Sequence, residues 1–110
     1  THKAARLEGD SKEKEMLAEG RIIKGLDPSL AEFAILVGDR WHGKGIGATL
    51  LHWCLKIAKS QGVRDIWGTV MSDNTQMIAL GRKLKFKIQR HPDSAEYEFR
   101  LDLRQLPDDL

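Results

Sequence analysis

A glycine-rich segment, His42-Gly43-Lys44-Gly45-Ile46-Gly47, separates an apolar stretch from a stretch with helical periodicity. The first amides of a helix have no partner inside the helix, and the helix dipole places partial positive charge there. Because glycines carry no Cβ, several N–H groups can converge on a diphosphate, and Lys44 adds a positive charge. The spacing therefore predicts an anion-binding loop. The alternative is a tight turn whose glycines only allow close packing.

Two other kinds of phosphate loop fit the same segment less well. The spacing is not the Gly-x-Gly-x-x-Gly fingerprint of dinucleotide-binding folds, and no acidic residue ends the next expected strand, 63–71, to bind a ribose. A Walker loop would need a Gly-Lys-Ser/Thr ending, which the segment lacks.

Glu32 is the candidate for acid–base chemistry. It lies within the apolar run Ala31–Val37, where an unpaired carboxylate is costly and burial raises the pKa toward neutrality. A group of that kind can accept a proton from an amine. The alternative is that Glu32 lies at the start of the strand and faces solvent or an arginine such as Arg21. The residues by themselves leave both readings open.

Periodicity and turn signals predict the elements that position these residues. The charged run Lys12–Glu15 is typical of a solvated helix face or a loose terminus. The run 31–37 predicts a central strand buried on both faces. Apolar spacing and glycine or asparagine boundaries then predict further elements: strands at 16–24, 63–71, 86–90 and 96–103, and helices at 45–61 and 74–85. This order implies a mixed α/β sheet that ends in a hairpin.

Composition narrows the class of protein. The 110 residues allow one domain, and 41% apolar with 31% charged residues is the balance of a globular chain rather than a disordered one. A net charge of +2 gives no argument for nucleic acid, and no apolar run is long enough for a membrane helix. The single cysteine cannot form an internal disulfide and fits a reducing compartment, so we expect a cytoplasmic protein. The spacing of the cysteine and the histidines predicts no metal site. The chain starts at Thr1 without a Met, and we expect a fragment of a larger protein.

The glycine segment resembles the pyrophosphate motif of the GNAT superfamily of N-acetyltransferases, Gln/Arg-x-x-Gly-x-Gly/Ala at the start of the central helix. Arg40-Trp41-His42-Gly43-Lys44-Gly45 also fits, but the usual spacing from Val37 favours the frame that starts at His42. The segment from Asn74 to Leu84-Lys85-Phe86 resembles the family's Asn…Leu-Gly-Phe helix beside the pantetheine arm. The resemblance covers 31–103 and does not extend to 1–19, where the family's roof over the acceptor site would lie. It implies an α/β (α+β) fold, a mixed, mostly antiparallel sheet flanked by helices, with a splayed central strand feeding the glycine loop.

The strand Ala31-Glu32-Phe33-Ala34-Ile35-Leu36-Val37 is similar to the Ala-Glu-Phe-Ala-x-x-Val strand of bacterial Pat-type protein lysine acetyltransferases. This resemblance implies that Glu32 is the catalytic base. The backbone of Leu36 and Val37, the loop residues His42, Gly43, Lys44, Gly45, Ile46 and Gly47, and Asn74 would then bind acetyl-CoA. Many superfamily members carry a Tyr general acid where this chain has Gly81, so the thiolate would leave unprotonated.

The resemblance implies an enzyme that acetylates lysine side chains of proteins such as metabolic acyl-CoA synthetases, with acetyl-CoA as co-substrate and no metal. Two alternatives stay open. The acceptor could be a small amine, or the domain could be a non-catalytic acetyl-CoA sensor, since the Tyr is missing and Lys85 replaces the expected Gly. We expect neither a nucleic acid nor a membrane as partner, and residues 1–110 to form a single acetyltransferase domain.

Overall fold

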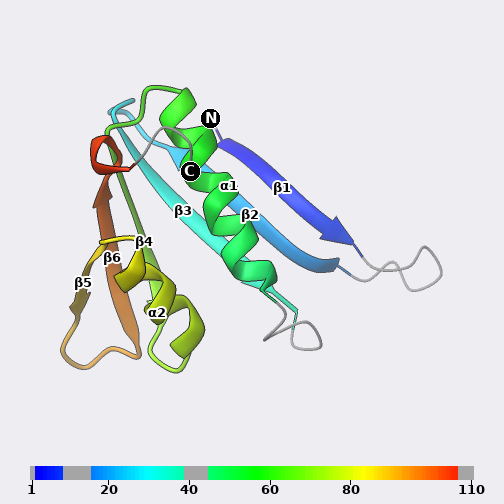
Figure 1. Ribbon diagram of the computed structural model, residues 1–110, viewed down its shortest axis with the longest axis vertical. Helices are drawn as coiled ribbons and strands as arrows, with labels where there is room; N and C mark the ends of the chain where they lie inside the picture. Colours follow the sequence, from blue (N-terminus) through cyan, green and yellow to red (C-terminus); the bar gives the residue numbers. More distant parts are fainter. Residues whose placement is uncertain (1, 9–15, 39–44, 107–110) are drawn as a thin grey trace.

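The computed structural model describes residues 2–8, 16–38 and 45–106, and of residues 2–8, 16 and 17 it describes the backbone only. Six strands form one sheet, in the order β1-β2-β3-β4-β6-β5 (Figure 1). All neighbouring strands are antiparallel except β3 and β4, which are parallel. The strands are β1 (His2–Glu8), β2 (Met16–Lys24), β3 (Leu30–Val37), β4 (Asp65–Met71), β5 (Lys87–Arg90) and β6 (Glu96–Asp102). The predicted mixed, mostly antiparallel sheet is therefore confirmed.

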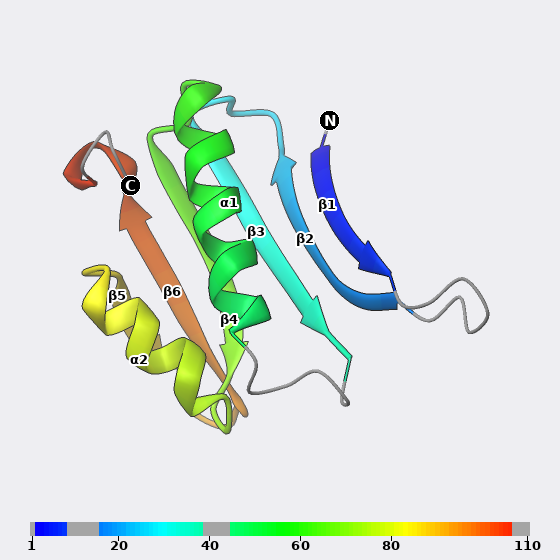
Figure 2. The ribbon, with the colours of Figure 1, turned by 45° about the vertical axis from the view of Figure 1, so that its right-hand side comes forward.

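Two helices, α1 (Ile46–Ser60) and α2 (Thr75–Lys83), lie on the same face of this sheet, and a short 3-10 helix, η2 (Leu103–Gln105), follows β6 (Figure 2). Helix α1 packs against β2 and β3, and α2 packs against β5. Each helix begins and ends within a few residues of its prediction, because the apolar stripe and the boundary glycine or asparagine both mark it. No helix of residues 2–8, 16–38 and 45–106 is long and apolar enough to cross a membrane.

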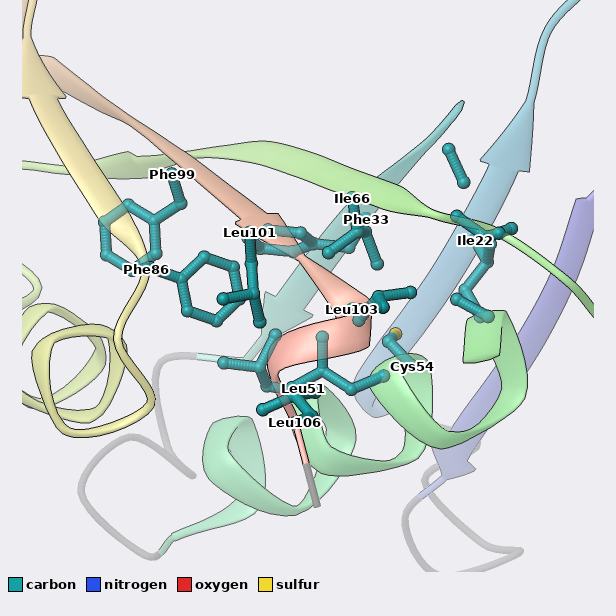
Figure 3. Close-up of a cluster of buried hydrophobic side chains, with 14 of the residues drawn as sticks. Ile22, Phe33, Leu51, Cys54, Ile66, Phe86, Phe99, Leu101, Leu103 and Leu106 are labelled. Atoms are coloured by element: carbon teal, nitrogen blue, oxygen red, sulfur yellow. The ribbon is translucent and has the colours of Figure 1, made fainter. Parts of the chain in front are cut away.

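The hydrophobic core lies between the helices and the sheet (Figure 3). Three aromatic rings of the core lie against one another, with centroid separations of 6.0 Å for Phe33–Phe86, 6.5 Å for Phe33–Phe99 and 5.5 Å for Phe86–Phe99. Glycines make room for two of them. A Cβ on Gly68 of β4 would lie 2.6 Å from the Phe33 ring, and one on Gly81 of α2 would lie 2.3 Å from the Phe99 ring. Such close approaches are possible only without a side chain.

Two sequence predictions about the strands are wrong. β3 is not buried on both faces: Ala31 and Phe33 are buried, whereas Leu36 is 62% exposed. The reason is that both helices pack on one face, so the alternate side chains of β3 face the opposite, open side. The second error is β1, where no strand was predicted. Its pairing with β2 is a tertiary contact of an edge strand, which local periodicity does not report. The charged run Lys12–Glu15 lies outside the described residues.

Candidate functional site

The parallel strands β3 and β4 stay together for only three residue pairs. Leu30 pairs with Asp65, Ala31 with Ile66, and Glu32 with Trp67, after which no further pairs form. Beyond Glu32 the two strands splay apart toward the end of β3 (Figure 2). A splay of this kind leaves backbone groups of both strands without ladder partners and opens the sheet. The predicted splayed central strand is therefore confirmed.

A cavity of about 470 Å³ opens at the splay. Its lining comes from four strands and from α2 with the residue that caps it, and it carries three carboxylates, one guanidinium and a set of apolar side chains. The residues that line it are Glu19, Arg21, Ile23, Glu32, Phe33, Ala34, Ile35, Leu36, Thr69, Val70, Met71, Asn74, Met77 and Glu96. Glu32, Leu36 and Asn74, three of the predicted site residues, thus share one cavity.

Glu32 is half-buried, and it faces Ile23 of β2 on one side and Trp67 of β4 on the other. The alternative interpretation was that Glu32 faces solvent or an arginine such as Arg21. The structure gives Arg21 a different partner, because its Nε donates to the carboxylate of Glu19. Within the described residues Glu32 forms no ion pair. A carboxylate at a cavity wall without a cationic partner is able to accept a proton from a ligand.

Glu19 is the functional candidate that the sequence analysis missed. It is 2% exposed, and it is the one buried charged side chain in the part of the chain whose burial is described. The signal was present in β2, where Glu19, Arg21 and Ile23 alternate with the small or apolar residues Ala18, Gly20 and Ile22. That alternation places Glu19 and Arg21 on the open face of the sheet together with Glu32.

The start of α1 has the geometry expected of an anion site. Gly45 caps the helix with a φ of 77°, a conformation that favours glycine, and it has no side chain with which to cap the first amides. Gly47 lies close to both α2 and β3: a Cβ there would come 3.1 Å from Met77 Cε and 3.8 Å from Val37 Cγ2. The helix N-terminus therefore lies beside the end of β3 and the first turn of α2. His42, Gly43 and Lys44 lie outside the described residues.

Helix α2 places two more residues of interest. The Asn74 side chain caps the helix by accepting from the Met77 N–H at 3.2 Å, and it borders the cavity. Gly81 is buried against Phe99, so a side chain there would point into the core and not toward the cavity. The Phe99 ring thus occupies the space that a side chain at position 81 would need.

The chain's one cysteine is not available as a nucleophile. Cys54 lies fully buried on α1, and its thiol donates weakly to the Arg21 carbonyl oxygen at 3.7 Å. Burial raises the pKa of the Cys54 thiol to about 12, so the reactive thiolate is scarce at neutral pH. Across residues 2–8, 16–38 and 45–106, no three His, Cys, Asp or Glu side chains come together as metal ligands.

These parts form a cavity at the strand splay, with the carboxylate of Glu32 in its wall and the first turn of α1 close to α2 and the end of β3. Comparison with solved structures identifies proteins of the same fold. A cAMP-binding acyltransferase from Mycobacterium smegmatis has a TM-score of 0.76 at 25% identity, over 98% of this chain and 32% of the other. This chain thus spans about a third of the length of the mycobacterial protein.

Two further solved structures share the fold. The GNAT domain of S. lividans PAT has a TM-score of 0.63 at 24% identity, over 81% of this chain and 55% of the other. Salmonella typhimurium yncA, solved with its cofactor acetyl-CoA, has a TM-score of 0.67 at 18% identity, over 84% of this chain and 61% of the other. The model of the acetyltransferase (GNAT) family matches residues 11–86, and acetyltransferases of this family use acetyl-CoA. The chain belongs to the acetyltransferase (GNAT) family.

Proposed function

We propose that this protein transfers an acetyl group directly from acetyl-CoA to the side-chain amine of a lysine on another protein, with Glu32 as the general base. One observation carries the proposal most strongly. Glu32 lines the cavity at the strand splay and has no ion-pair partner among the described residues, because Arg21 binds Glu19. The proposed protein substrates are metabolic enzymes such as acyl-CoA synthetases, as the likeness of strand 31–37 to Pat-type enzymes implies.

The described residues fit acetyl-CoA at the splay. Gly45 has no side chain with which to cap the first amides of α1, and Gly47 packs so closely on Met77 that a Cβ would be crowded. We assign the pyrophosphate to the segment His42-Gly43-Lys44-Gly45-Ile46-Gly47, of which the last three residues are described. The backbone of Leu36 and Val37 and the Asn74 side chain would hold the acetyl and pantetheine end, since Leu36 and Asn74 border the cavity.

The chemistry needs a base because a protonated amine has no lone pair for attack. When bound, acetyl-CoA supplies a thioester whose carbonyl carbon gains a C–N bond and loses its C–S bond, with the coenzyme A thiolate as leaving group. Glu32 accepts the proton from the acceptor ammonium, directly or through a water. A thiol with an ordinary pKa near ~8.5 is already a fair leaving group, so the missing tyrosine at Gly81 does not prevent transfer.

The cavity wall supports a cationic acceptor. It presents the carboxylates of Glu19, Glu32 and Glu96 against the single guanidinium of Arg21, so its charge attracts an ammonium group. Around it the open face of the sheet exposes Ile23, Leu36 and Met71, which are 38%, 62% and 50% accessible. Apolar side chains around an acidic cavity favour a protein surface as acceptor over a free amine.

Direct transfer is supported by the lack of a usable thiol. Cys54, the chain's one cysteine, is buried on the core side of α1 and does not line the cavity. We further propose that residues 1–110 form one acetyltransferase domain within a longer protein, as in the mycobacterial relative of which this chain spans about a third. A cytoplasmic location accords with a free buried thiol and with acyl-CoA synthetases as substrates.

The experiment incubates the protein with ¹⁴C-acetyl-CoA and either an acyl-CoA synthetase or spermidine. We expect label on the synthetase, and its loss by about 10²-fold or more with Glu32→Gln. Glu98→Gln is the matched control, since Glu98 lies on the same open face outside the cavity lining. Label on spermidine but not on the protein would make this a small-amine acetyltransferase. Tight acetyl-CoA binding with no transfer to either acceptor would make it a sensor, and either result would overturn the proposal.

A further inference from the structure

Glu19 and Arg21 form an ion pair in the cavity that Glu32 lines, and the two lie on one strand with a single residue between them. Both belong to β2, and their side chains line the same cavity as Glu32. In the β2–β3 register, Arg21 is opposite Ala34 and Ile23 is opposite Glu32. Arg21 is therefore the diagonal neighbour of Glu32, a position from which a long side chain can reach across the strands.

Burial of the Glu19 carboxylate costs free energy, and its position beside Arg21 suggests a functional reason for the burial. A carboxylate that is 2% exposed loses most of its hydration, and replacing a buried ion pair by apolar residues is often neutral or stabilising. The Arg21 side chain is 45% exposed, so it has room to change rotamer and bind a different carboxylate. Pairing with Glu19 engages the Nε of the guanidinium with a carboxylate of its own strand, and no ion pair between Arg21 and Glu32 forms.

An arginine paired with Glu32 would make the carboxylate a weaker general base. An opposite charge within ~4–6 Å lowers a carboxylate's pKa by about 1 to 3 and occupies the oxygens that must accept the proton. From this, and resting on the proposed role of Glu32, we infer that Glu19 is a positioning residue that holds Arg21 away from Glu32 and so keeps the base unpaired.

Where side chains are described, the other charged groups around Glu32 do not compete for this role. On the open face β4 contributes Asp65, which pairs with Arg64 at 3.1 Å. From β6, Arg100 lies beyond Trp67 and pairs with Glu98 at 3.7 Å, and Glu96 borders the cavity as a further anion. Arg21 is thus the one cation that lines the cavity among the described residues.

The test follows the ionisation of Glu32 by ¹³C NMR of its side-chain carboxyl, together with the pH dependence of acetyl transfer to an acyl-CoA synthetase. In Glu19→Gln we expect Arg21 to turn to Glu32. The Glu32 pKa and the acidic limb of the pH–rate profile then both move to lower pH by about 1, and kcat falls by roughly tenfold while KM for acetyl-CoA stays constant. Glu98→Gln removes the carboxylate of an equivalent Glu-x-Arg pair outside the cavity, and it should leave the pH–rate profile unchanged.

Two further variants separate positioning from a merely structural role. Glu19→Asp keeps the pair and should retain most of the activity. Glu19→Gln/Arg21→Gln has no guanidinium to reach Glu32, so it should regain activity over Glu19→Gln. If the double variant stays as slow as Glu19→Gln, or if Glu19→Gln leaves the Glu32 pKa unchanged, the inference is overturned. Should Glu32→Gln itself transfer at the wild-type rate, the proposed function fails first, and the two failures are thereby distinguished.

Discussion

Gly81 offers a quantitative test of how closely α2 packs on the Phe99 ring. A Cβ there would lie 2.3 Å from Phe99 Cε2 and 3.0 Å from both Cδ2 and Cζ. Carbon atoms in contact are normally separated by ~3.5 Å or more, so the overlap exceeds ~1 Å. Phe99 is fully buried and touches the rings of Phe33 and Phe86, which leave it little room to move.

For Gly81→Ala we expect a net loss of about 2 kcal/mol in the free energy of unfolding. Overpacking of this severity costs about 3 kcal/mol, while the higher helix propensity of alanine returns about 1 kcal/mol. At about 4 °C per kcal/mol the melting temperature should fall by about 8 °C. Urea and thermal unfolding, followed by circular dichroism, would measure both.

The matched control is Gly47→Ala, also in a helix, where the nearest atom to a new Cβ is the mobile end of Met77 at 3.1 Å. Its stability should stay within about 0.5 kcal/mol of the wild type, because a flexible methyl group can give way. A Gly81→Ala protein as stable as the wild type would refute the reasoning, since Phe99 would not then fill the space beside Gly81.

Three other changes have outcomes that the structure specifies. Lys85 has a φ of 71°, so Lys85→Gly should raise the free energy of unfolding in urea by about 1 kcal/mol. Asp93→Gly, at φ 63°, should gain less because aspartate tolerates this conformation better. No gain in Lys85→Gly would contradict the strain at that residue. Gly45→Glu should weaken acetyl-CoA binding by more than about tenfold in calorimetry. Gly62→Glu, with a similar φ of 81° at the far end of α1, should bind acetyl-CoA normally. Equal affinities of the two variants would contradict the assignment of the glycine segment to the pyrophosphate. Cys54, whose pKa is raised to about 12 by burial, should react with a disulfide reagent at pH 8 only as fast as the protein opens, and rapid labelling of the native protein would contradict its burial.

Local patterns predicted much of this fold. The apolar stripe of α1, the cap at Asn74 and the alternation in β4 each depend on a few neighbouring residues, and each lies where expected. The positive φ of Lys85 also accords with the family glycine expected there, because Phe86 N–H bonds to Gly81 O and Lys85 N–H bonds to Arg82 O, closing the helix in a Schellman motif. Such features are local, so sequence reports them directly.

The features that sequence did not predict depend on contacts between distant strands. β1 exists through its pairing with β2, and the one-sided burial of β3 follows from where the helices pack. The same holds at the site. Whether Glu32 faces Arg21 could not be decided from the chain, because the answer depends on Glu19, and the carboxylate of Glu19 is placed by the sheet register.

The role of Glu32 as general base in acetyl transfer is tested most directly by the rate of a single turnover across pH. The protein is saturated with ¹⁴C-acetyl-CoA and mixed with an acyl-CoA synthetase, and the first-order rate of label transfer is followed for the wild type and Glu32→Gln between pH 6 and pH 10. We expect the variant to be slower by about 10²-fold or more at neutral pH, and the deficit to shrink at high pH, where solvent removes the proton from the lysine. Equal rates for the two proteins at neutral pH would show that Glu32 is not the base.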